Sequence, residues 1–156
     1  MTVRIRRVTT TRAGGVSAPP FDTFNLGDHV GDRPAAVEAN RARLAAAIKL
    51  PPERVIWMNQ VHGDRVEVVD EPRTEPFEDT DALVTTTPRL ALAVVTADCV
   101  PVLMGDARAG VVAGVHAGRV GAADGVVLRT LEAMLAHGAH VEDISVLLGP
   151  AVSGVN

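Results

Sequence analysis

Short apolar runs, each followed by polar or turn-forming residues, recur along the chain from position 55 onward. Runs of this length that are rich in valine are typical of strands rather than of helices. They predict strands at 55–58, 66–69, 82–85, 90–96, 100–104, 111–115 and 144–148. Since many strands and few helices are indicated, the pattern favours an α+β domain over a regular alternation of strand and helix.

A helix is predicted before these strands, from Pro34 to Ile48. Asp32 is expected to cap it, proline suits its first turn, and the prolines that follow it end it. The residues of its apolar stripe are Val37, Leu44 and Ile48. Asn40 and Arg41 fall on the same face by the 3.6-residue period, and polar side chains on an inward face need partners.

A second helix is predicted late in the chain, from Gly121 or Ala122 to His137. Two segments are instead expected to be loops. Residues 12–31 are rich in glycine, proline, serine and asparagine, with a turn at 25–28, and residues 70–80 are acidic and contain prolines. A loop as long as 12–31 in a compact domain is typically functional or disordered.

The length and charge of the chain narrow the class of protein. Its 156 residues suit a single domain, 1–156, with a real core. The net charge is −4, the basic residues are scattered and tyrosine is absent, so neither nucleic acid nor an anionic membrane is an expected partner. The first residues lack the apolar stretch of a secretory signal, and a single cysteine excludes an intrachain disulfide. The expected location is therefore the cytoplasm.

Three of the apolar runs lead to a side chain that can bind a transition metal. His62 follows the run at 55–61, Cys99 follows that at 90–97, and His116 follows that at 111–115. Strand ends of one sheet can converge, so the three side chains could meet. One thiolate and two imidazoles suit zinc, and three protein ligands leave a fourth position for water or substrate.

Spacing alone leaves two other interpretations open. His-x36-Cys-x16-His is not a local metal motif. The same residues would also fit a buried cysteine with two hydrogen-bonded core histidines. A Cys–His nucleophile pair without metal is the third interpretation.

Four further residues are candidates for the site. The small-residue loop 116–125 opens a helix, where Arg119 could help to bind an anion or could simply lie in solvent. Arg41 on an inward face is either paired or directed into a pocket. Asp98 could act as a base, orient a ligand, or bind nearby backbone N–H groups. His29 could reach the site, although a surface position is the commoner outcome.

Seven motifs occur along the chain in one order. They are RAGGVS (12–17), NLGDHVGD (25–32), NR (40–41), QVHG (60–63), DALVT (81–85), TADCVPV (96–102) and HAG (116–118). Together they resemble the YfiH-type laccase-domain family, also called the multicopper polyphenol oxidase or purine nucleoside phosphorylase family. The resemblance extends over essentially the whole chain.

This resemblance implies a four-layer α/β/β/α sandwich with a metal site at His62, Cys99 and His116. It implies a zinc enzyme that phosphorolyses adenosine, inosine, guanosine and methylthioadenosine and deaminates adenosine, with nucleosides and phosphate as its partners. Copper is the alternative metal. Arg41 and Asp98 are then the expected catalytic residues. The residues expected to bind substrate or phosphate are Asn25, His29, Asn40 and Arg119.

The chain departs from the family pattern in two places. The family string after His-Ala-Gly is Trp-Arg-Gly, whereas here Arg119-Val120-Gly121 follows. Family members also continue beyond the position of residue 156, so the expected sandwich lacks its C-terminal part. The alternative functions are therefore a copper-dependent polyphenol oxidase and a truncated, inactive family member.

Overall fold

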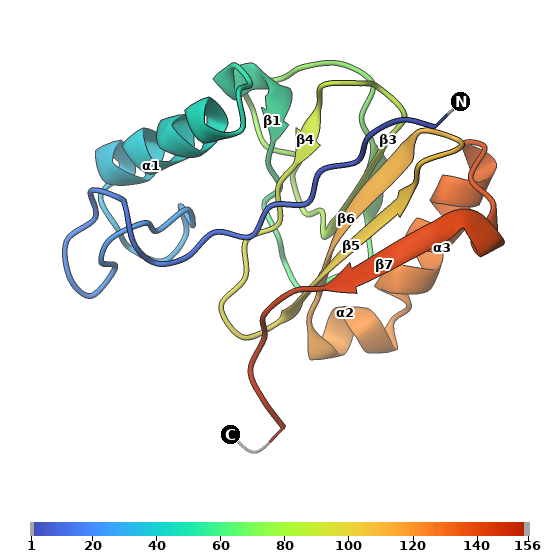
Figure 1. The fold of residues 1–156 in the computed structure, drawn as a ribbon. Coiled ribbons are helices and arrows are strands. Elements are labelled where there is room, and N and C mark those ends of the chain that lie inside the picture. The colour runs from blue at the N-terminus through green and yellow to red at the C-terminus, as the bar shows by residue number, and fades with distance from the viewer. Residues whose placement is uncertain (1, 155–156) are drawn as a thin grey trace.

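The protein has four layers of secondary structure (Figure 1). The structure, a computed structural model, describes residues 2–154. Helix α1 (Pro34–Ala47) lies outside a small sheet of β1 (Val55–Ile56) and β4 (Ala91–Leu92). A five-stranded sheet forms the third layer and helix α3 (Val126–Ala136) the fourth. The predicted α+β class and the α/β/β/α order of layers are thus confirmed.

The five-stranded sheet has the order β2-β3-β6-β5-β7. Its strands are β2 (Val66–Val68), β3 (Ala82–Thr85), β5 (Val100–Asp106), β6 (Val111–Ala117) and β7 (Ile144–Leu148). Within this sheet β2 and β3 pair in parallel, and the other neighbouring strands pair antiparallel. Strand β6 is central, which suits its apolar, valine-rich sequence. Short 3₁₀ helices, η1 (Pro52–Arg54) and η2 (Val141–Asp143), precede β1 and β7.

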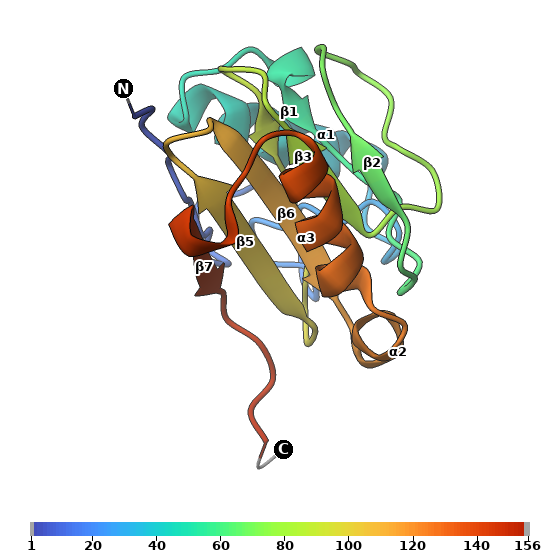
Figure 2. The same cartoon turned by 90° about the vertical axis from the view of Figure 1, so that its right-hand side faces the viewer.

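Each face of the large sheet packs on its own hydrophobic core. On one face, α3 covers the strands (Figure 2), and Val126 and Met134 of α3 are fully buried against them. On the other face, Leu83 of β3 packs with residues of the small sheet and its flanks. Gly114 of β6 permits this approach, because a Cβ there would lie 3.1 Å from Val94 Cγ2.

The strand predictions hold best for strands that pair along their length within the large sheet. The predicted bounds 82–85 and 144–148 are those observed, and β5 and β6 run two residues further than predicted. The run at 90–96 forms only the two-residue β4. The reason is that Val95 bonds a side chain: its N–H donates to Gln60 Oε1 and its carbonyl accepts from Gln60 Nε2.

Two details of the predicted helices are wrong. Arg33, not Asp32, is the N-cap of α1, and Asp32 Oδ1 instead accepts the N–H of Arg33. The single late helix is two helices, α2 (Arg119–Ala123) and α3, because Gly125 takes the left-handed conformation with φ 93° between them. Glycine adopts this conformation at no steric cost.

Asn40 of α1 holds the long loop onto the body of the protein. Residues 12–31 contain neither helix nor strand, as predicted. Asn40 is fully buried; its Oδ1 accepts the N–H of Val16, and its Nδ2 donates to Ser17 Oγ and to the carbonyls of Thr23 and Asn25. The inward polar residue of the helix thus finds its partners in the loop.

None of the helices within residues 2–154 combines the length and the apolar character that a membrane crossing requires.

Candidate metal centre

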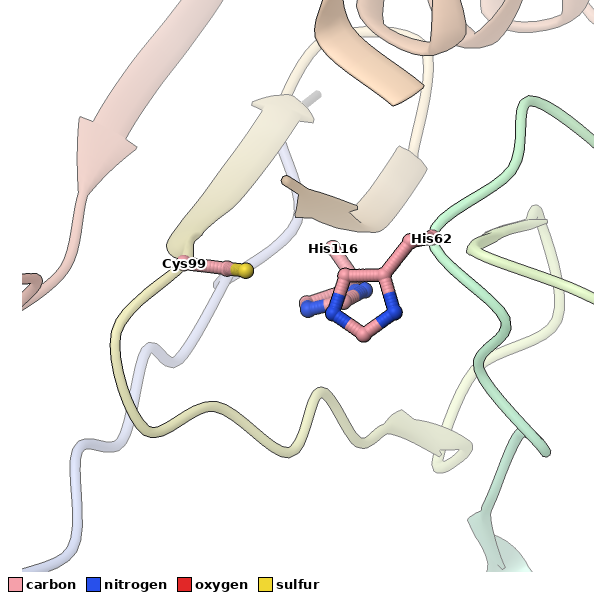
Figure 3. Close-up of side chains that lie close together, drawn as sticks. All are labelled: His62, Cys99 and His116. Atoms are coloured by element: carbon pink, nitrogen blue, oxygen red, sulfur yellow. The ribbon is translucent and has the colours of Figure 1, made fainter. Parts of the chain in front are cut away.

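The structure brings His62, Cys99 and His116 together. One ligand atom from each lies within 4.8 Å of the others. Figure 3 shows the thiol directed toward the two imidazoles, whose ring centroids are 4.9 Å apart and whose planes are inclined by 70°. His116 is buried, Cys99 is half-buried and His62 is exposed, so the cluster has one closed side and one side open to solvent.

The three side chains do not come from three strand ends of one sheet. His116 lies in β6, and Cys99 comes immediately before β5, whose first residue pairs with Ala117. Cys99 therefore lies at the start of a strand rather than at the end of one. His62 lies in the loop that connects β1 of the small sheet to β2 of the large sheet. The expectation of three strand ends from one sheet was wrong, although the side chains do converge.

Glycines beside the cluster allow the close approach of its parts. A Cβ on Gly118 would lie 3.0 Å from His62 Cδ2 and 3.3 Å from Cys99 Sγ. A Cβ on Gly121, in α2, would lie 2.5 Å from the carbonyl oxygen of Gly63. The small residues after His116 thus have a packing role: they let α2 lie against the His62 loop.

A buried carboxylate, that of Asp81, lies behind the cluster. Its Oδ2 is 2.7 Å from His116 Nδ1. The carboxylate also accepts the backbone N–H groups of Val61, His62 and Gly63, each at 3.0 Å. Asp81 is the first residue of the DALVT motif, but its place in the site could not be recognised from the sequence. The signal it offered was an acidic residue directly before a fully buried strand.

The donor set of the cluster fits a transition-metal ion such as zinc. One thiolate and two imidazoles are common zinc ligands, and structural zinc sites almost always have four protein ligands. Three ligands with one open side correspond to the catalytic type, which keeps a position for water or substrate. A carboxylate that binds the second nitrogen of a histidine is the usual partner of a metal-binding imidazole.

Arg41 lines a separate hollow of about 330 Å³. Its guanidinium lies 3.9 Å from the centre of the Trp57 ring, and Nε and Nη2 both donate to the carbonyl of Leu26. Asp28 is 3.7 Å from Nη2. Burial lowers the pKa of Arg41 below its ordinary value, and the group stays a cation at neutral pH. The lining residues are Asp28, His29, Arg41, Met58, Asn59, Gln60 and Val95.

The other predicted site residues are dispersed. His29 lies beside Arg41 at the hollow, with an exposed side chain. Asn25 bonds Gly27 and Asp32, so that it, like Asn40, shapes the loop. Asp98, next to Cys99, and Arg119, at the start of α2, are both exposed. Beyond Asp81, the sequence reasoning also missed the contributions of Gln60 and Trp57.

The chain is similar to one described protein family and to named proteins of several bacteria. Residues 6–156 match the family model described as multi-copper polyphenol oxidoreductase laccase. A protein of Mycobacterium tuberculosis named purine nucleoside phosphorylase is 79% identical over all 156 residues, which are 62% of its length. A Corynebacterium glutamicum protein of the same name is 54% identical over 97% of this chain and 63% of its own length.

Two solved structures share the fold. YfiH of Bacillus licheniformis superimposes with a TM-score of 0.87 at 33% identity, over 90% of this chain and 56% of that one. YlmD of Geobacillus stearothermophilus gives 0.85 at 36% identity, over 92% of this chain and 56% of its own. The chain thus spans a little more than half the length of these structures.

Proposed function

The chain belongs to the multi-copper polyphenol oxidoreductase laccase family, and from this premise we propose that it is a zinc-dependent purine nucleoside phosphorylase that also deaminates adenosine. The observation that carries the proposal is the cluster of His62, Cys99 and His116, whose ligand atoms lie within 4.8 Å of one another and have one side open. The name of the relatives, purine nucleoside phosphorylase, supplies the substrate class.

The metal cluster and the hollow lined by Arg41 have different proposed roles. A zinc ion held by His62, Cys99 and His116 would supply a Lewis acid that polarises a substrate group or water. His116, buried and bonded to Asp81, fixes the closed side of the cluster, while the exposed His62 borders the side from which a nucleoside enters. Asp98, exposed beside Cys99, is the group available there to exchange a proton with solvent.

Arg41 is the proposed phosphate-binding residue. Its guanidinium is a partly buried cation that stacks on Trp57, and its bonds to Leu26 fix its orientation. A cation with less water around it binds an anion more strongly. A volume of about 330 Å³ is within the range of small-molecule sites. His29 at the rim adds a second group for the phosphate, and Arg119 a cation near the cluster.

A copper oxidase of phenols is the second candidate, and the description of the family favours it. Oxidases that reduce oxygen to water need several copper centres, and therefore several sets of ligands. Within residues 2–154, His62, Cys99 and His116 form a single such set. The ligand set therefore supports a mononuclear enzyme.

The test uses the 156-residue chain loaded separately with zinc and with copper. Each form is incubated with adenosine, with and without phosphate, and the products are separated by chromatography. We expect the zinc form to produce adenine only when phosphate is present, because phosphorolysis consumes phosphate. It should produce inosine, the product of deamination, with or without phosphate. Cys99→Ala should lower both rates about 100-fold or more, since even the partners of metal ligands are worth about 10- to 100-fold.

The control variant is His137→Ala, which removes an exposed histidine at the end of α3. It should keep the metal content and both rates of the unmodified chain. Turnover of phenols by the copper form alone would replace the proposal with the oxidase. Absence of nucleoside products from a zinc-loaded, folded chain would show that this chain is an inactive family member.

A further inference from the structure

We propose that Asp81 is the positioning residue of the metal centre. Its single carboxylate holds both the ring of His116 and the backbone of His62 in place. The inference rests on the metal binding proposed above and is independent of the reaction. It is carried by four hydrogen bonds that converge on one buried side chain.

The first half of this role concerns His116. Its Nδ1 is 2.7 Å from Asp81 Oδ2, and the two side chains are 4% and 0% exposed, so water does not compete for the bond. A carboxylate only accepts, and a neutral imidazole carries one proton. The proton of His116 is therefore held on Nδ1, which leaves the lone pair of Nε2 for the metal. The backbone reinforces this contact, because the N–H of His116 donates to the Asp81 carbonyl.

The second half concerns the turn that carries His62. His62 has φ 61°, in the left-handed region that residues with a Cβ rarely adopt. Asp81 Oδ1 accepts the N–H groups of Val61 and Gly63, and Oδ2 accepts that of His62. Successive N–H groups that converge on one anion form a stable concave site. The carboxylate thus offsets the backbone strain and keeps the His62 ring beside that of His116.

These bonds exclude a role for Asp81 as the base of the reaction. Each carboxylate oxygen already accepts two hydrogen bonds, and the side chain is fully buried behind His116, away from the open side of the cluster. Asp81 therefore acts through the two histidines. Its position follows from topology: it precedes β3, which pairs with β6 and so places residue 81 opposite residue 116.

The experiment compares the unmodified chain with Asp81→Asn and with Asp64→Asn. Asp64 is a matched control, because it follows the same turn but bonds Arg129 at the surface. Long-range ¹H–¹⁵N correlation spectra of the metal-free proteins report which nitrogen of His116 carries the proton. Competition with a chromophoric chelator gives the dissociation constant for zinc.

We expect the proton on Nδ1 of His116 in the unmodified chain and in Asp64→Asn. In Asp81→Asn it should be redistributed between the two nitrogens, and the dissociation constant for zinc should rise about 10- to 100-fold. An Asp81→Asn protein with an unchanged tautomer and zinc affinity would overturn the proposal. If Asp81→Asn does not fold, the unmodified chain alone still tests the proposal. A proton on Nε2 of its His116 would also overturn the proposal. Failure of the unmodified chain to bind zinc would refute the proposed function, whereas the tautomer would still test Asp81.

Discussion

Single residues without reactive groups determine whether the metal cluster can form. Gly118 is the clearest example, since a methyl group at this position would lie 3.0 Å from His62 Cδ2 and 3.3 Å from Cys99 Sγ. Both contacts are shorter than ordinary van der Waals distances, so one of the two side chains must move. The small residues after His116 are therefore part of the geometry of the centre.

Gly118→Ala should lower the affinity for zinc about tenfold, because overpacking of this kind costs about 1–3 kcal/mol. The measurement is chelator competition, with the thermal unfolding of the metal-free protein recorded in parallel. Gly63→Ala is the matched control: a Cβ there would be 3.6 Å from Val61 Cγ2, an ordinary contact. Equal losses in the two variants would contradict the steric explanation.

The sequence could predict which three side chains meet in the cluster, because thiol and imidazole groups are recognised by their chemistry and their motifs. It could not predict the role of Asp81. That role depends on the pairing of β3 with β6, which places residues 81 and 116 side by side although 35 positions separate them. The bonds of Gln60 to Val95 and the stacking of Arg41 on Trp57 are likewise tertiary contacts between distant segments.

Among the elements, α1 shows how a helix with an imperfect apolar face can be stable. Its inward face carries Asn40, which is buried and bonded to four groups of the loop 12–31. The sequence indicated that Asn40 needs partners but not which ones. The family resemblance implied that Asn40 binds the substrate. In the structure, the donors and the acceptor of its side-chain amide are instead already bonded to the protein.

Asn40→Ala should lower the free energy of unfolding by about 2–3 kcal/mol, because the N–H of Val16 loses its buried partner. Urea denaturation measures this loss. Glu38→Ala, an exposed position on the same helix, should change it by no more than about 0.5 kcal/mol. An Asn40→Ala protein of full stability that no longer turns over nucleosides would instead show that Asn40 contacts the substrate.

The predictability of the elements follows strand pairing rather than burial, since β3 is buried and β7 is mostly exposed. Strands β3 and β7 have the predicted bounds, because local pattern and pairing agree there. The run at 90–96 has the composition of a strand, but β1, its partner, is only two residues long, and Val95 bonds Gln60 instead. The break between α2 and α3 depends on the conformation of Gly125, which an apolar period does not reveal.

At the scale of the whole molecule, the cluster lies where the chain crosses from the small sheet to the large one. His62 is in the loop that connects β1 of the small sheet to β2 of the large sheet, whereas Cys99 precedes β5 and His116 lies in β6, both strands of the large sheet. Composition and pattern predicted the α+β class, and the resemblance predicted the order of the layers. Neither indicated that one of the three side chains lies in the connection between the sheets, because that depends on how the sheets stack.

Zinc should therefore stabilise the whole fold, since it binds only when both sheets are in place. A ligand at 100 times its dissociation constant contributes about 2.7 kcal/mol, and for a domain of this size about 1 kcal/mol raises Tm by about 2–4 °C. We expect a rise of about 5–10 °C in the unmodified chain, measured by thermal unfolding with and without zinc, and no rise with magnesium, which prefers oxygen ligands. Cys99→Ala should lose the effect because two imidazoles alone bind zinc weakly. An equal rise of Tm in Cys99→Ala would mean that zinc binds elsewhere, for instance at the exposed His137. In that case the rise should be absent from a His137→Ala chain.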